Sequence, residues 1–229
     1  MTTRLPLFPL NSVVFPGVAT PLHVFEERYR ALVRDLLGRS DPADRIFGIT
    51  AIREGFEVAG PGDSVEHGRQ SLCTTGTVVQ LTGVEPYDDG RFDIETVGRQ
   101  RFVLHEVDGS GDYAVGAVDL VTEPDTDDVT GVEAERTLAI FERYRDRLGR
   151  MRGGPVLSGQ LPRDPTYLSW SLSATCLLTQ AQRQELLEAP DTLTRLVLLR
   201  HSLVEEMEAM QVVPSLPATG ISRMGWSPN

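Results

Sequence analysis

The chain has 229 residues and a formal net charge of −11, with 40% hydrophobic and 24% charged residues. This length and composition are ordinary for one large or two small globular domains, and the negative charge opposes binding to nucleic-acid phosphates. All 22 basic residues are arginine. Because a Walker A loop and a Ser–Lys catalytic pair each require a lysine, the composition excludes both of them.

Membrane and export signals are not evident in the sequence. No apolar run approaches the ~20 residues of a membrane-spanning helix. The N-terminus lacks the basic segment and apolar core that are typical of an export signal. Cys73 and Cys176 lie far apart and form no CxxC motif. We therefore expect a cytoplasmic protein with two reduced thiols.

Prolines shape the first forty residues. Proline fixes φ and disfavours a helical conformation at the preceding residue. We expect an extended, edge-like strand from Leu5, a reversal at Phe15–Gly17, a second extended segment, and then an amphipathic helix. The predicted apolar face of this helix consists of Phe25, Tyr29, Leu32, Val33, Leu36 and Leu37.

The next eighty residues are predominantly β in pattern. Ile46–Ile52 is short and apolar, as in a buried strand, and Leu72–Val84 is rich in Thr and Val. Asp88–Gly90 is a hairpin signal, because Asp-Gly suits a tight turn. Alternating apolar residues predict further strands over Phe92–Leu104 and Tyr113–Val121.

The pattern becomes helical after the acidic segment Glu123–Asp128, which we interpret as a linker. Helix starts are predicted at Thr130–Glu133, Asp164–Pro165, Thr179–Gln182 and Asp191, where residues suited to N-caps occur. Residues 149–159 are predicted to form a loop. The expected organisation is a β domain over 1–124, a helical bundle over 125–211, and a Pro/Gly/Ser-rich tail over 212–229.

Three motifs in order resemble the N-terminal substrate-binding domain of Lon proteases. They are the opening Leu5-Pro-Leu with Val13-Val-Phe-Pro-Gly17, the strand and hairpin from Gly76 to Phe102, and the closing segment Arg183 to Asp191 with the apolar run after it. The resemblance implies an α+β fold: a PUA-like β pseudo-barrel with an inserted helix, followed by a C-terminal α-helical bundle. Since Lon proteases continue into ATPase and protease modules that are not seen here, it implies a standalone bacterial member without enzymatic activity.

Motifs for catalysis or metal binding are weak. His23 lies near Glu26 and Glu27 but has no second histidine beside it, so we expect no metal site. His201 and Glu205, four residues apart on a helix, are typical of a surface pair. No Gly-x-Ser-x-Gly motif occurs. We expect neither a cofactor nor catalysis, and an unrecognised enzyme remains the least favoured alternative.

The candidate binding residues are apolar. A rigid proline-containing turn loses little entropy on binding, which points to Phe15, Pro16, Val18 and Leu22. Tyr167 and Trp170 are added as residues of a possible groove between the domains. In the C-terminal tail, Met224 and Trp226 are candidates for docking the tail into a groove.

The leading interpretation is a non-catalytic module that binds unfolded or extended protein segments. It would act as an adaptor for a separately encoded protease or chaperone, or alone as a holdase. The alternative is a PUA-like RNA-binding protein with a stripe formed by Arg91, Arg99 and Arg101, although the net charge makes nucleic acid an unfavoured partner.

Overall fold

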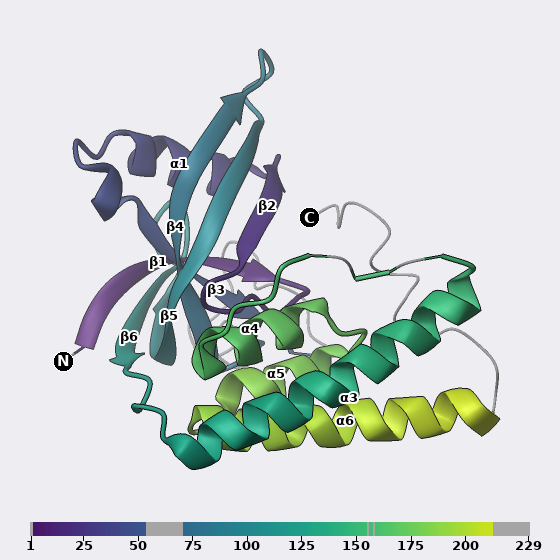
Figure 1. Ribbon diagram of the computed structural model, residues 1–229. Coiled ribbons are helices and arrows are strands. Elements are labelled where there is room, and N and C mark those ends of the chain that lie inside the picture. The colour runs from purple at the N-terminus through teal and green to yellow at the C-terminus, as the bar shows by residue number, and fades with distance from the viewer. Residues whose placement is uncertain (1, 54–70, 155, 158, 213–229) are drawn as a thin grey trace. The chain divides into compact units, whose positions relative to one another are not determined.

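The computed structural model describes residues 2–53, 71–154, 156–157 and 159–212 (Figure 1). The contacts divide the chain into two compact units, with the division between Thr122 and Glu123. Over the described residues, no helix combines the length and apolar character needed to cross a membrane. The prediction for Met224 and Trp226 lies outside the described residues.

The first unit is built on one sheet. Its described strands are β1 (Thr2–Leu10), β2 (Ala19–Val24), β3 (Ile46–Ala51), β4 (Thr75–Pro86), β5 (Phe92–Asp108) and β6 (Val115–Val121). The strand order is β2-β5-β4-β3-β1-β6, and β6 also pairs with β5. The five strands other than β2 therefore form a closed ring of pairings, and β2 extends the sheet from β5.

Strand β1 is not an edge strand, contrary to the expectation from its prolines. Its first half pairs antiparallel with β6, and its second half pairs parallel with β3. The two registers meet at Leu7, which lies opposite Gly48 of β3 and whose N–H donates to the carbonyl of Ala114; on either side of Leu7, β1 is paired with one of these strands only. Pro6 and Pro9 lack a backbone N–H, and a strand that is paired on one side at a time can accommodate this loss.

Strand β5 is long because it pairs with three other strands. Its 17 residues pair with β4, with β2 through Phe92–Val97, and with β6 through Arg101–Asp108. Register shifts place an extra residue in β5 at Arg99 and again at His105. Such bulges bend a strand and increase its twist, which allows the ring to close. The connecting turn to β4 contains Gly90 at a φ of 82°, as the Asp-Gly hairpin signal predicts.

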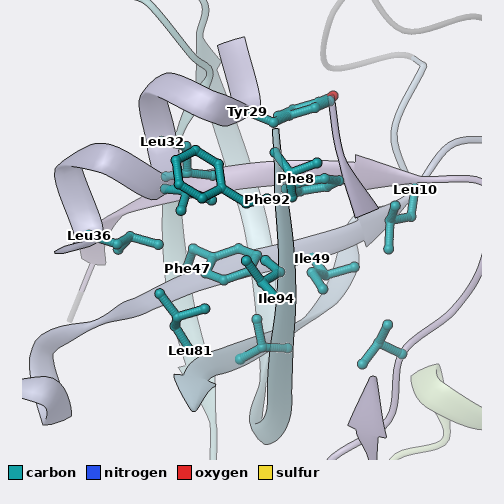
Figure 2. Packing of buried hydrophobic residues seen from close by; sticks show 14 residues of the cluster. Phe8, Leu10, Tyr29, Leu32, Leu36, Phe47, Ile49, Leu81, Phe92 and Ile94 are labelled. Atoms are coloured by element: carbon teal, nitrogen blue, oxygen red, sulfur yellow. The ribbon is translucent and has the colours of Figure 1, made fainter. Parts of the chain in front are cut away.

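Helix α1 (Glu27–Leu37) covers one of the two apolar clusters in this unit (Figure 2). Tyr29 stacks on Phe8 with a ring-centroid distance of 4.0 Å. Leu32 and Leu36 lie beside it on the same buried face, as the helical spacing predicts. Burial raises the pKa of Tyr29 to about 12, and its hydroxyl has no hydrogen-bond partner among the described residues.

Two residues of the predicted helical face are not buried. Phe25 lies before the N-cap residue Glu26 and is 37% exposed, and Leu37, at the last position, is also exposed. The apolar face that the sequence predicts is therefore too long by one residue at each end. The helix α1 is followed along the chain by a 3₁₀ turn at Pro42–Asp44.

The second unit contains helices α3 (Asp128–Arg152), α4 (Pro165–Thr175), α5 (Gln180–Glu188) and α6 (Thr192–Val212). The predicted caps of the last three are confirmed: the side chains of Asp164, Thr179 and Asp191 accept hydrogen bonds from the backbone N–H of Tyr167, Gln182 and Thr194.

The predicted start of α3 was wrong. Asp127 is its N-cap and accepts hydrogen bonds from both the backbone N–H and the hydroxyl of Thr130, at 2.8 and 2.7 Å. The helix also continues through Gly149 to Arg152 and ends at Gly153, which has a φ of 73°. The loop predicted over 149–159 is correspondingly shorter.

Candidate functional site

The turn before β2 is fixed against β5. The backbone N–H of Gly17 donates to the carbonyl of Gly98 at 2.9 Å, and the N–H of Gly98 donates to the carbonyl of Val18 at 3.0 Å. A Cβ atom at Gly98 would lie 2.2 Å from the carbonyl oxygen of Phe15, so only glycine permits this approach. The turn is therefore rigidly held, as the prolines predict.

This anchoring determines which backbone groups of β2 face outward. The carbonyl of Val18 accepts from Gly98 and so points toward β5, and the direction of the backbone groups alternates from one residue to the next along an antiparallel strand. Thr20, Leu22 and Val24 therefore direct their backbone groups toward β5. The carbonyl of Thr20 also accepts from the hydroxyl of Thr96 at 2.8 Å, which agrees with a carbonyl directed toward β5. The backbone groups of residues 19, 21 and 23 are directed away from β5.

Strand β2 is an edge strand. Within the described part of the chain it pairs with β5 alone. Pro21 falls at an outward position, so it removes one outer donor without breaking the ladder to β5. Edge strands are templates for pairing with other chains, and proline is a common device that limits such pairing. The outer edge of β2 can therefore accept a short extended segment at Ala19, whose backbone groups are directed away from β5.

Apolar side chains flank this edge. Val18 and Leu22 are half-buried, and Leu22 packs on the cluster beneath α1. Phe25 follows β2 and is 37% exposed. Its ring lies 6.1 Å from that of His23. A segment paired with β2 would find contact surface for its own apolar side chains at both ends of the strand.

Polar residues from the β4–β5 hairpin surround His23. Its Nδ1 lies 2.6 Å from Oδ1 of Asp93, and the hydroxyl of Tyr87 donates to Oδ2 of the same carboxylate at 2.5 Å. The bond from Tyr87, followed by that from His23, lowers the pKa of Asp93, whereas the bond to Asp93 raises the pKa of Tyr87. Arg91 approaches the other ring nitrogen of His23 at 3.5 Å.

This group of residues ties β2 to the hairpin. The contacts join β2, the hairpin turn and β5, so they hold the edge strand in place rather than exposing a reactive group. In the described ranges, no group of three or more His, Cys, Asp or Glu side chains could hold a metal ion.

The predicted site residues fall into three groups. Phe15 is 0% exposed and Pro16 is buried, so both shape the turn from inside. Val18 and Leu22 lie at the edge described above. Tyr167 and Trp170 belong to the helical unit.

The two helical-unit residues differ in burial. Tyr167 is 56% exposed, whereas Trp170 is 1% exposed. Trp170 lies beneath Arg195, whose guanidinium carbon is 3.2 Å from the ring centroid. Phe15, Pro16 and Trp170 are buried, which corrects the expectation that these side chains line an exposed surface.

The arginine stripe of the RNA alternative does not form a free basic surface. Arg101 is buried, Arg99 donates to Gln80, and Arg91 pairs with Asp89 at 2.7 Å. The bulge in β5 at Arg99 interrupts the alternation of side-chain direction, so the residues before and after the bulge do not form one continuous row. No observation in the first unit therefore favours RNA.

Sequence reasoning missed Phe25, Tyr87 and Asp93 as neighbours of β2. The sequence pattern places Phe25 on the helix, and it gives no role to Tyr87 or Asp93. The alternation along residues 19–24 was a usable signal for His23 facing away from the core. Its partner Asp93 could be found only from the β2–β5 register.

The structure is a mixed α+β fold in which β2 lies at the edge of the described sheet. Solved structures share this fold. A Lon N-terminal domain protein from Xanthomonas campestris is 26% identical, with a TM-score of 0.54 over 90% of this chain and 98% of that chain. The N-terminal domain of Mycobacterium avium complex Lon protease is 19% identical, with a TM-score of 0.62 over 89% and 99%; at this identity the likeness concerns the fold alone.

The chain belongs to the ATP-dependent protease La (LON) substrate-binding domain family, whose model matches residues 4–205. Among curated relatives, the Lon protease of Porphyromonas gingivalis is 27% identical over 94% of this chain and 25% of its own length. The Lon protease of Escherichia coli K12 is 25% identical over 91% and 26%. The chain thus spans about a quarter of the length of these relatives.

Proposed function

We propose that this protein recognises other proteins by binding unfolded or extended segments at the outer edge of β2. A bound segment would pair with the outward backbone groups of β2 at Ala19 and pack its side chains on Val18, Leu22 and Phe25. The observation that carries the proposal is the edge position of β2 in the described chain, held by Gly98 within a substrate-binding family domain. Pro21 limits the ladder to a short stretch, which suits reversible binding.

The proposed role is non-catalytic. The family match supports substrate recognition, and the first unit serves as a PUA-like pseudo-barrel that presents β2, followed by the helical bundle. The protein would act in the cytoplasm, either as an adaptor that delivers segments to a separately encoded protease or chaperone, or alone as a holdase.

The direct test measures binding of the full chain to reduced, carboxymethylated ribonuclease and to native ribonuclease. Binding to the unfolded form alone is expected. The double variant Val18→Ser, Phe25→Ser removes exposed apolar contact area, which is worth about 1 kcal/mol, and so weakens binding ~5-fold. Equal binding to both ribonuclease forms, or none to either, contradicts the proposal.

Leu120→Ser is the matched control, because Leu120 is a 48% exposed apolar residue of β6 in the same unit. This variant is expected to leave the affinity for unfolded ribonuclease unchanged. If Leu120→Ser and the double variant weaken binding equally, general hydrophobicity and not the β2 edge is responsible.

A further inference from the structure

Positive charge is concentrated at one place in this acidic chain. Residues 143–152 of α3 contain five arginines and one acidic residue, whereas the whole chain has a net charge of −11. Charge compensation at the end of a helix explains only part of this. Arg150 and Arg152 lie in the last turn, where cations interact favourably with the helix dipole. Arg143 and Arg147 lie one to two turns earlier, beyond the reach of that effect.

Three of these arginines lie on one face of α3. Arg143, Arg147 and Arg150 are spaced i, i+4 and i+7, so their side chains form a row. They line a groove of about 820 Å³ between α3 and α6, which run side by side in Figure 1. Among the described residues, none of the three forms an ion pair. The row is therefore available to a ligand with negative charge.

The floor of the groove is apolar. It is formed by Ile140, Met151, Val204, Met207 and Met210. Methionine side chains adapt to differently shaped partners because they are unbranched and polarizable, and they are frequent at surfaces that bind helices. An apolar floor beside a basic row is suited to a ligand that carries apolar and acidic residues on adjacent faces.

The residue on the opposite wall narrows the kind of ligand that the groove can bind. Glu208 of α6 lines the groove across from the arginine row. A uniformly charged polyanion such as RNA would meet this carboxylate as well as the net charge of the chain. An amphipathic helix presents its acidic residues on one side only, so it can face the arginines and leave Glu208 in contact with solvent.

We propose that the α3–α6 groove docks an acidic amphipathic helix of a partner protein. Its acidic residues would be spaced i, i+4 and i+7 to match the arginine row, and its apolar residues would contact the methionine floor. From Arg143 to Arg150 the row spans ~10 Å along α3, so the partner helix contributes about two turns. The groove makes no use of β2, and the two sites are tested by different variants.

The test uses fluorescence anisotropy with the full chain and a synthetic, labelled 18-residue helix. The probe carries Glu at i, i+4 and i+7 and Leu on the adjacent face; a second peptide has Gln in place of each Glu. Arg147→Glu is expected to weaken binding of the Glu probe by about tenfold or more, and higher salt to weaken it further. Arg163→Glu is the control, because Arg163 is exposed, lies outside the groove lining, and changes the net charge equally.

Each outcome decides the proposal. Binding of the Glu probe that is lost in Arg147→Glu and retained in Arg163→Glu supports it. Equal affinity for the Glu and Gln peptides, equal effects of the two variants, or no binding of the Glu probe at about 1 mM overturns it. A single-stranded RNA oligonucleotide that binds through Arg147 while the Glu probe does not would also overturn it, and would identify the groove as a nucleic-acid site.

Discussion

Replacing Arg195 by methionine is expected to destabilise the helical unit strongly. Arg195 of α6 is 0% exposed. Its Nε donates to the hydroxyl of Ser169 at 2.8 Å, its Nη2 lies 3.1 Å from Oε2 of Glu123, and its guanidinium stacks on Trp170. One side chain thus joins α4, α6 and the segment that precedes α3.

The magnitude follows from these contacts. Methionine retains the apolar stem, so little cavity forms. A cation–π contact with a desolvated ring is worth about 2 kcal/mol, and a hydrogen bond to a charged group about 1.5–3 kcal/mol. The Glu123 side chain is 23% exposed and becomes hydrated after the change, so its ion pair adds less. The expected loss in the free energy of unfolding is ~3–5 kcal/mol.

Urea unfolding followed by tryptophan fluorescence measures this loss. The chain has two tryptophans, so the replacement Trp226→Phe, made in every variant, leaves Trp170 as the reporter for its own unit. A loss of this size lowers the urea midpoint by about 2 M or more. The control Arg163→Met alters an exposed arginine and is expected to change stability by less than ~0.5 kcal/mol.

A midpoint for Arg195→Met within about 0.5 M of the parent chain would refute the argument, because the buried contacts would then contribute no net stability. If this variant does not fold, Ser169→Ala tests the same cluster. It removes one acceptor of Arg195 and is expected to cost about 1–3 kcal/mol. No measurable cost in that variant would equally contradict the reasoning.

The other predictions concern the β unit. Tyr29→Phe is expected to leave its stability unchanged or raise it by up to about 1 kcal/mol in urea unfolding, since it removes a buried hydroxyl without a partner among the described residues; a loss above ~1 kcal/mol would show that the hydroxyl is satisfied. Gly98→Ala forces a Cβ against the Phe15 carbonyl and should cost ~1–3 kcal/mol, whereas Gly131→Ala, in open space on α3, should stabilise by up to ~1 kcal/mol; equal thermal shifts would contradict this contrast. Hydrogen bonds from the Ser110 hydroxyl and backbone and from Arg4 lower the pKa of Asp108 to about 2 from its ordinary value of 3.8, so its stabilisation is present above pH ~4 and lost as the pH falls toward 2. Asp108→Asn should therefore be less stable at neutral pH and lose less on acidification, and parallel pH–stability curves for the two proteins would disprove the linkage.

Local signals in the chain were sufficient where neighbouring residues make the decisive contact. The caps at Asp164, Thr179 and Asp191 each bind a backbone N–H three residues away, and the Asp-Gly turn needs only the permissive φ of Gly90. The motifs that resemble the Lon substrate-binding domain likewise identified the family correctly.

The start of α3 shows where local signals become ambiguous. Asp127 and Thr130 are both suitable N-caps, and they are separated by a single turn. In the structure Asp127 accepts two bonds from Thr130, which lies buried inside the helix. Asp is preferred to Thr at an N-cap, and the burial of Thr130 favours the same start, so both effects select Asp127.

Tertiary structure alone decided which apolar residues remain at the surface. Phe15, Trp170 and Phe25 are similar in type, but contacts distant in sequence bury the first two and leave Phe25 at the β2 edge. The pairing of His23 with Asp93, 70 residues away, arises in the same manner. The type of a residue determines how strongly its side chain tends to avoid water. Strand register and packing determine which of these side chains are buried, because burial depends on partners that only the folded chain brings together.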